Sequence, residues 1–94
     1  MMNEPKMTLI KDGIRIDYPD GSHELRINGD YYSYNAYGQF HSRGDKPAAI
    51  YPDGRKYWYK NGNLHRDNGP ALVFYSGVKY WYKNNKYVKM VSPD

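Results

Sequence analysis

A stretch of sixteen residues is repeated almost at once in this chain, and the repetition limits the folds available to it. PAAIYPDGRKYWYKNG occupies residues 47–62, and PALVFYSGVKYWYKNN occupies residues 70–85. Proline, glycine, tryptophan and asparagine recur 23 positions apart in the two copies. A fixed spacing of this size is typical of repeat architectures, in which each repeat is one supersecondary unit. Function therefore has to be sought on surfaces that several units share.

Composition favours a thin β structure over a large enclosed core. The 94 residues form a single domain, 1–94, and a chain of this length buries only about 60 to 65% of its unfolded surface. Tyrosine supplies 12 residues, with 2 Trp and 2 Phe, so aromatic side chains carry much of the packing. A tyrosine ring suits a half-buried sheet surface because its hydroxyl can stay in water.

The net charge and the absence of cysteine say more about the cellular compartment of the protein than about its function. A net charge of +4 favours an acidic partner but is also normal for a soluble surface. The lack of cysteine excludes a disulfide framework and a thiolate metal site. No apolar run approaches about 18 residues, and the N-terminus has no signal-peptide core. We expect a cytoplasmic protein without membrane contact.

Turn dipeptides predict a β-meander in the N-terminal third. Asp-Gly and Asn-Gly supply the two positive-φ positions of a type I′ hairpin turn. If Asp20-Gly21 forms such a turn, Ile16 lies opposite Leu25 and one face of the hairpin is apolar. A shift by one residue would place Ile16 against Glu24, so we reject that register. The dipeptides are Asp12-Gly13, Asp20-Gly21 and Asn28-Gly29.

An earlier and degenerate copy of the unit is indicated by YPDG, which occurs at residues 18–21 and again at 51–54. The offset is 33 because of a tyrosine-rich insertion, residues 30–38, which we interpret as one extra strand with its turn. No long segment has helical periodicity. We expect an all-β fold, an antiparallel meander of repeated β-hairpins with a repeat of about 23 residues, in a single twisted or curled sheet with essentially no helix. The expected units are a degenerate repeat at 7–37 and repeats at 38–61 and 62–90.

The same register predicts two different faces in the later units. It places Ala49 opposite Trp58 and Leu72 opposite Trp81, on a core stripe shared with Leu25. The other face becomes apolar and rich in tyrosine, which on a one-layered sheet indicates a binding surface. Together with the inserted segment, the predicted partner-binding residues are Tyr31, Tyr32, Tyr34, Ile50, Tyr57, Tyr59, Val73, Tyr80 and Tyr82.

The chain resembles MORN-variant repeat proteins, whose units combine DG, an aromatic pair, and NG-x-LHR-x-DGPA. The resemblance covers about residues 18–86 and implies β-hairpin meanders. Such proteins occur in phages, giant viruses and bacteria, some of them antitoxin-like, and related repeats are scaffolds for protein or lipid contacts. The chain departs from the pattern at Asn85, where glycine is usual, at Ser76-Gly77 and in the insertion. The matching elements are Asp53-Gly54, Tyr57-Trp58-Tyr59, Asn61-Gly62, Leu64-His65-Arg66 and Asn68-Gly69-Pro70-Ala71.

Chemistry-bearing residues do not combine into a recognisable catalytic or metal site. His41 and His65 are equivalent in the repeat, but no HxH or HExxH spacing accompanies them, so structural roles in the loops are favoured. Asp12, Asp20 and Asp53 occupy turn positions, where aspartate serves hairpin geometry. We expect no metal, no cofactor and no enzymatic activity.

The predicted function is non-catalytic binding of a partner protein through the tyrosine-rich face. The resemblance narrows this to a small phage- or bacterium-encoded inhibitor or neutraliser of a host defence factor or toxin. Two alternatives remain open. KYWYK at residues 56–60 and 79–83 interleaves lysine with aromatic rings, as single-stranded nucleic-acid platforms do, although the tryptophans can equally be core. A structural role through self-association into a homodimer is the other.

Overall fold

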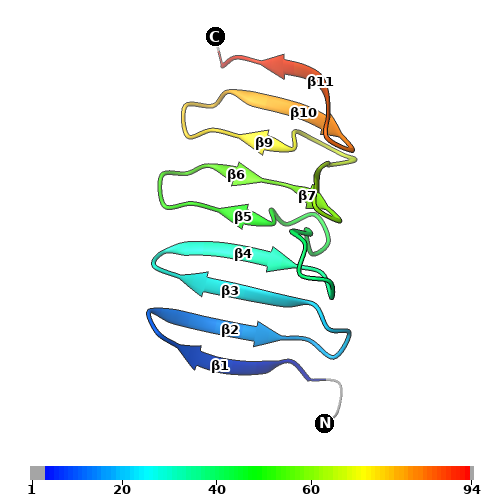
Figure 1. Ribbon diagram of the computed structural model, residues 1–94. Coiled ribbons are helices and arrows are strands. Elements are labelled where there is room, and N and C mark those ends of the chain that lie inside the picture. The colour runs from blue at the N-terminus through cyan, green and yellow to red at the C-terminus, as the bar shows by residue number, and fades with distance from the viewer. Residues whose placement is uncertain (1–3, 94) are drawn as a thin grey trace.

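The computed structural model describes residues 4–93 as a single antiparallel meander, and no helix occurs in that range. Nine strands form the main sheet in the order β1-β2-β3-β4-β5-β6-β9-β10-β11, and β7 and β8 form a separate hairpin (Figure 1). The strands are β1 (Lys6–Ile10), β2 (Gly13–Asp17), β3 (His23–Ile27), β4 (Asp30–Tyr34), β5 (Ala49–Ile50), β6 (Lys56–Tyr57), β7 (Tyr59–Lys60), β8 (Asn63–Leu64), β9 (Leu72–Val73), β10 (Lys79–Lys83) and β11 (Lys86–Val91).

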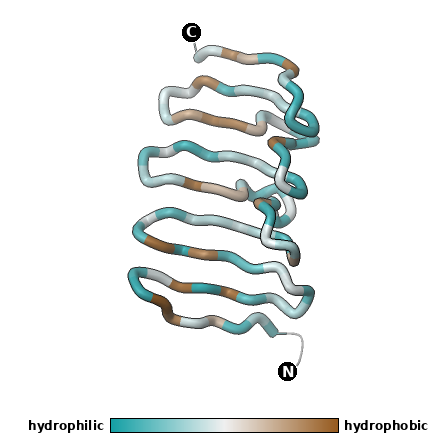
Figure 2. Tube along the Cα trace, viewed as in Figure 1, coloured by the Kyte–Doolittle hydropathy of each residue, from teal (hydrophilic) through white to brown (hydrophobic). Residues whose placement is uncertain are grey.

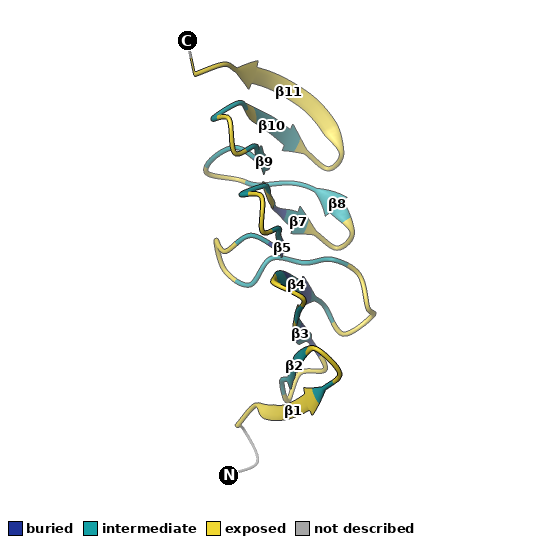
Figure 3. Ribbon diagram, turned by 90° about the vertical axis from the view of Figure 1, so that its left-hand side faces the viewer, coloured by how far each residue is buried: buried dark blue, intermediate teal, exposed yellow. Residues whose placement is uncertain are grey.

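The molecule is an elongated plate, 48 × 25 × 18 Å, with one layer of sheet. Seen from its edge, the sheet has no second layer of secondary structure on either side in the described part of the chain (Figure 3). Strongly hydrophobic segments are short and separated by pale or hydrophilic ones, because tyrosine replaces aliphatic residues in most strands (Figure 2). The predicted all-β meander in a single sheet is therefore confirmed.

The turns at YPDG have three-residue loops, which overturns the predicted register. The amide of Gly21 donates to the carbonyl of Tyr18 (3.0 Å), and the amide of Tyr18 donates to the carbonyl of Ser22 (2.9 Å). Pro19 thus occupies the second position of a β-turn, where its fixed φ is favourable, and Gly21 follows with a φ of 90°. The predicted type I′ turn would have a loop of only two residues.

The extra loop residue shifts every pairing between β2 and β3 by one. The turn predicted at Asp12-Gly13 is also displaced, because Gly13 already pairs with Ile10 and the turn consists of Lys11 and Asp12. Ile16 lies opposite Glu24 and Leu25 lies opposite Arg15, the arrangement that the polarity argument had rejected. The same shift recurs later, where Ala49 pairs with Tyr57 and Leu72 pairs with Tyr80 instead of with the tryptophans. Because side chains alternate with a period of two, a one-residue shift moves a residue to the opposite face.

Asparagine-led turns behave as predicted. Asn28 and Gly29 have φ values of 52° and 85° and close β3 onto β4, with Ile27 paired to Asp30. Asn61-Gly62 and Asn84-Asn85 form equivalent two-residue turns between β7 and β8 and between β10 and β11. Asn85, with a φ of 68°, takes the place of the usual glycine because asparagine tolerates left-handed backbone.

Residues 30–38, interpreted from the sequence as an insertion, form the strand β4 and a turn at residues 35–38. The backbone hydrogen bonds of Ser33 in β4 correspond to those of Trp58 in the next unit. Ser33 donates to the carbonyl of Ala48 (2.8 Å) and accepts from the amide of His41 (3.0 Å); Trp58 donates to Ala71 (2.8 Å) and accepts from His65 (3.1 Å). By these bonds Ser33 stands where Trp58 stands in the next unit, a place the sequence had assigned to Leu25.

Packing is densest in the middle of the plate and thins toward both ends. The buried apolar residues are few and mostly small, whereas β11 is exposed throughout and β1 nearly so (Figure 3). Within residues 4–93, no helix has the length and apolarity needed to cross a bilayer. The buried apolar side chains are Tyr31, Ala48, Ala49, Trp58 and Ala71.

Candidate functional site: the aromatic face of the sheet

One face of the sheet collects most of the aromatic rings. The residues that pair directly across neighbouring strands share a face, so the pairing runs from Leu25 through Tyr32, Ala49, Tyr57 and Leu72 to Tyr80. Alternation along each strand adds further rings to this surface. We call it the tyrosine face, defined by Tyr32, Tyr34, Phe40, Tyr51, Tyr57, Tyr59, Phe74, Tyr80 and Tyr82.

The rings of the tyrosine face form a nearly continuous contact series across the middle of the sheet. Tyr34 and Phe40 stack with centroids 5.1 Å apart, and Phe40 and Tyr59 stack at the same distance. A second line runs from Tyr32 through Tyr51 to Tyr57, with edge-on contacts of 5.9 and 5.5 Å. All of these side chains are only partly buried, so the ring surfaces are shared between one another and solvent.

Six of the nine predicted binding residues lie on the tyrosine face. Ile50 and Val73 do not, because the one-residue shift places them on the opposite side, which Ile50 shares with Lys56. Their predicted position was wrong. Tyr31, predicted only as part of the inserted segment, also lies on the opposite side and is buried. The six that lie together are Tyr32, Tyr34, Tyr57, Tyr59, Tyr80 and Tyr82.

Three rings of the tyrosine face escaped the sequence interpretation. Phe40 lies just beyond the turn after β4, and Tyr51 and Phe74 begin the turns after β5 and β9. They come from turn-flanking positions and therefore lie outside the strand alternation used to find candidates. Tyr51 and Phe74 are 23 positions apart, and this repeat spacing was the sequence signal that could have identified them as equivalent residues.

The opposite side, the tryptophan face, is covered by loops where Trp58 lies. Trp58 is 6% exposed, its Nε1 donates to the carbonyl of Asp45 (2.8 Å), and the Arg66 guanidinium stacks 4.0 Å from its ring centroid. Arg66 also donates two hydrogen bonds of 2.9 Å to the Asp45 carboxylate. The predicted core role of Trp58 is consistent with this enclosure, although its neighbours are loop residues rather than Ala49.

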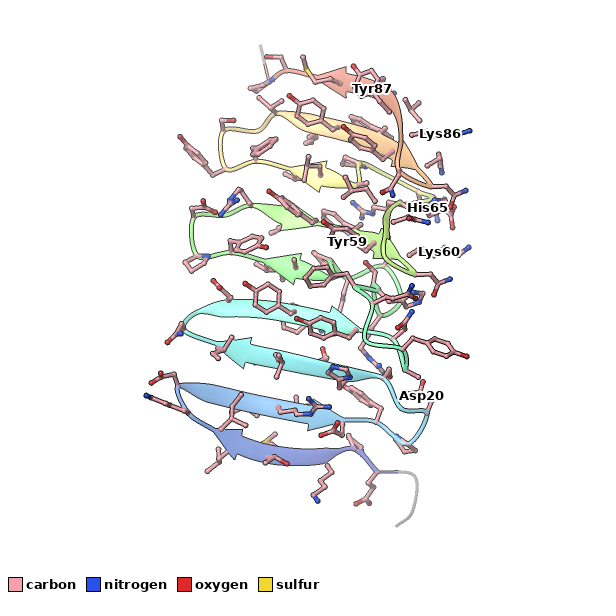
Figure 4. All side chains as sticks on the ribbon, in the orientation of Figure 1. Asp20, Tyr59, Lys60, His65, Lys86 and Tyr87 are labelled. Carbon is pink, nitrogen blue, oxygen red and sulfur yellow. The ribbon has the colours of Figure 1, made fainter. Side chains whose placement is uncertain are left out.

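The histidines join one unit to the next through backbone hydrogen bonds. His41 Nδ1 accepts from the amide of Asn61 (3.0 Å), and His65 Nδ1 accepts from the amide of Asn84 (3.0 Å). His65 Nε2 lies 2.8 Å from Asp67, and this contact lowers the pKa of the Asp67 carboxyl. Figure 4 shows His65 toward the edge of the sheet with Asp20, Lys60 and Lys86. Both rings are therefore occupied in holding the asparagine turns.

A buried carboxylate lies on the tryptophan face of the N-terminal strands. Glu24 is 4% exposed and accepts hydrogen bonds from the hydroxyls of Tyr18 and Tyr31, with Lys46 3.6 Å away. Burial by itself would raise the pKa of Glu24, but these hydrogen bonds and nearby cations outweigh it and lower that pKa. Arg43 stacks on Tyr18 at 3.4 Å. This cluster takes the place that tryptophan packing fills in the next unit.

Two hollows lie along the loop edge, and polar residues predominate among those that line them. One of about 270 Å³ lies between the loops around Asp45 and Asp67 and includes both histidines. Another of about 440 Å³ lies between Asp20 and Tyr37. No three His, Asp or Glu side chains come together as metal ligands anywhere in residues 4–93. The hollows carry charges of both signs, and in the second one the Ser22 hydroxyl donates to the Asp20 carboxylate (2.5 Å) and accepts from Arg43 (2.6 Å).

The lysines of KYWYK lie on the side opposite to the tyrosines. Lys56 and Lys79 both pair with Val73 on the strand between them. Because Val73 lies opposite to the tyrosine face, both lysines point away from that face. Lys60 and Lys83 follow by alternation along the strand. The lysines of KYWYK therefore lie on the opposite face from the stacked tyrosines, and the enclosed Trp58 offers no free ring for a base. A different cation, Arg55, stacks on Tyr51 of the tyrosine face, 4.3 Å from its ring centroid.

Three hydroxyls of the tyrosine face, those of Tyr32, Tyr34 and Tyr59, have a raised pKa and are protonated donors. Burial raises the pKa of both Tyr34 and Tyr59. Burial and a hydrogen bond to Asp30 raise the pKa of Tyr32 as well. Tyr59 lies on the sheet beside the labelled loop residues in Figure 4. The face can thus offer flat apolar rings together with phenolic O–H groups.

Comparisons with protein-family models, with curated proteins and with solved structures found no match for this chain.

Proposed function

We propose that this protein is a non-catalytic binding module that docks a partner protein on its tyrosine face. The observation that carries the proposal is the series of contacting, partly exposed aromatic rings on a sheet face that no other layer of residues 4–93 covers. Tyrosine anchors provide large contact area with few rotatable bonds, so they bind at low entropic cost. Such a surface serves recognition without any catalytic group.

Protein rather than single-stranded nucleic acid is the favoured partner because of where the cations lie. Nucleic-acid platforms place stacking rings beside lysine or arginine that tracks the phosphates. Here Lys56 and Lys79 point away from the tyrosine face. Arg55, which stacks on Tyr51 of that face, is paired with the Asp53 carboxylate at 2.8 Å. The resemblance to MORN-variant repeats adds the specific version of the proposal, an inhibitor or neutraliser encoded by a phage or bacterium and acting in the cytoplasm.

Affinity capture from a bacterial lysate tests the proposal. Immobilised wild-type protein should retain at least one protein in stoichiometric amount, and the double variant Tyr57→Ala/Tyr59→Ala should lose it. The matched control is Tyr37→Ala/Tyr75→Ala, because these tyrosines lie on turns and are 89% and 78% exposed. Retention of the same proteins by all three forms, or capture of nucleic acid alone, would contradict the proposal.

A further inference from the structure

Exposed apolar side chains gather at the two ends of the sheet. Within residues 4–93, eight large apolar residues are exposed, and six of them lie on the terminal strands β1 and β11 (Figure 3). Leu9 at 81% and Met7 at 64% are the most exposed of the six, and both belong to β1. The outer side of an edge strand also carries unpaired N–H and C=O groups, to which another chain can pair. The ends of the sheet are therefore the places where self-association has to be sought.

The outer side of β11 is ill suited to a further strand, whereas that of β1 is regular. Lys89 lies in the middle of β11, and the pairing of β11 with β10 is irregular because Val88 is an extra residue between two paired positions. Edge lysines and bulges are features that prevent edge-to-edge pairing. The strand β1 pairs without a break over all five of its residues, and its one lysine, Lys6, is the first of them. The β1 edge is therefore the better candidate.

The open backbone groups of β1 belong to Met7 and Leu9. Along an antiparallel strand, residues that bond to one neighbour alternate with residues whose N–H and C=O point to the other side. The bond from the Tyr18 amide to the Ser22 carbonyl (2.9 Å) shows that even-numbered positions of β2 bond to β3, so its odd-numbered residues bond to β1. Those odd-numbered residues pair with the even-numbered residues of β1. Met7 and Leu9 therefore direct their N–H and C=O groups to the open edge.

Two copies of β1 are complementary in one antiparallel register. With a two-fold axis at Thr8, Met7 lies opposite Leu9 of the second copy, and Leu9 lies opposite Met7. Each of these two pairs exchanges both N–H···O bonds, so four bonds satisfy every open group of Met7 and Leu9 in both copies. A shift of two residues would place Leu9 opposite Pro5, which has no N–H, or Met7 opposite Lys11 in the turn.

The side chains agree with this register. Directly paired residues share a face, so Met7 and Leu9 lie on the tryptophan face, beside the two isoleucines of β2. In the paired copies these side chains form one apolar cluster that crosses from one copy to the other. Thr8 lies opposite Thr8 of the second copy, which is a favourable pair on a sheet. Lys6 lies opposite Ile10, so no two cations are directly opposed.

From these open groups and matching side chains, we infer that the protein forms a homodimer in which β1 pairs antiparallel with β1 of a second copy, around a two-fold axis at Thr8. The axis is perpendicular to the sheet, so both tyrosine faces lie on the same side of one continuous sheet. Joining β1 to β11 is less favourable because these strands run in the same direction (Figure 1), and translated copies would pair in parallel and without an end. The dimer does not depend on the proposed function, but it presents the candidate binding surface twice.

Sedimentation velocity from about 1 µM to about 1 mM protein tests the dimer, because pairing through one short strand buries little surface and binds weakly. The sedimentation coefficient of the wild-type protein should rise with concentration to that of a dimer. Met7→Pro removes two of the four bonds and leaves the bonds to β2 intact, because the Met7 N–H points outward. It should weaken dimerisation about thirtyfold, the effect of two hydrogen bonds. Circular dichroism verifies that each variant is folded.

The register is tested by charges at the two-fold axis. Thr8→Lys and Thr8→Glu should each weaken dimerisation about fivefold, because like charges then lie directly opposite, and an equimolar mixture of the two should restore it. Val88→Lys is the matched change on β11 and should have no effect, since Val88 is 52% exposed. A wild-type protein that stays monomeric throughout, a species larger than a dimer, loss of the dimer through Val88→Lys in place of Met7→Pro, or no recovery in the mixture would overturn the inference. Lysate capture through the tyrosine face tests the proposed function independently of these outcomes.

Discussion

The two faces of the sheet use their aromatic residues differently. On the tryptophan face, Trp58 is 6% exposed and is enclosed by Arg66 and by the backbone of Asp45. On the tyrosine face, Tyr57 and Tyr59 touch other rings but stay partly open to solvent. Tyr57, Trp58 and Tyr59 are consecutive, and their side chains alternate between the two faces.

This difference separates residues that hold the fold from residues that are available to a partner. A one-layered sheet of this size has little interior, so each enclosed ring carries a large share of the burial. The loops cover the tryptophan face at Trp58, while the rings of the tyrosine face stay partly open to solvent. Substitutions on the first face should therefore act on stability, and substitutions on the second should act on binding.

Trp58→Ala should have the largest effect on stability. Removing a buried aromatic ring costs about 3–5 kcal/mol of unfolding free energy, which a small domain can scarcely lose. Trp58→Phe keeps a ring but removes the hydrogen bond to Asp45, and it should remain folded with a smaller loss. Urea denaturation followed by tyrosine fluorescence measures both. A Tyr59→Ala variant that is destabilised as much as Trp58→Ala would break the comparison between the faces.

Glu24→Gln should come next. The carboxylate accepts from Tyr18 and Tyr31 and is 4% exposed. Hydrogen bonds to a charged group contribute about 1.5–3 kcal/mol, and the amide replaces one acceptor oxygen with a donor, so a loss of about 2 kcal/mol is expected. Chemical denaturation at pH 7 measures it. Stability equal to wild type would show that the buried cluster does not anchor the N-terminal strands.

Acid should weaken the wild-type protein through the same cluster. The folded pKa of Glu24 lies below its ordinary value of 4.5, so the unfolded chain takes up the proton first as pH falls. The stabilisation is fully present above about pH 4.5 and is lost as pH falls through the folded pKa. Thermal melts between pH 3 and 7 should show a steeper loss in wild type than in Glu24→Gln. Parallel profiles would contradict this assignment.

The strands and the single sheet were predictable because their signals are local. Asn28-Gly29 and Asn61-Gly62 specify two-residue turns by their own backbone preferences, and the structure has both. The register of the YPDG hairpins was not predictable from polarity alone. Pairing Ile16 with Leu25 looked better than pairing it with Glu24 only because the buried partners of Glu24 were not visible in the sequence.

The candidate face was therefore predicted in part. Alternation along a strand correctly grouped Tyr57 with Tyr59, because it does not depend on the neighbouring strand. Assigning Ile50 and Val73 to the same surface depended on the cross-strand register and failed with it. Phe40 joins the face from outside the strands, through stacking contacts that a period-two pattern does not describe.

Tyr59→Phe should have the smallest effect on stability and thereby sharpen the comparison. The ring keeps its stacking with Phe40, so we expect a change within about 0.5 kcal/mol. The matched change on the other face, Tyr18→Phe, removes a donor to buried Glu24 and should cost clearly more. If the Tyr59 hydroxyl serves recognition, Tyr59→Phe should still weaken retention of the partner protein in the lysate capture. A destabilisation by Tyr59→Phe equal to that of Tyr18→Phe would mean that this hydroxyl holds the fold rather than a partner.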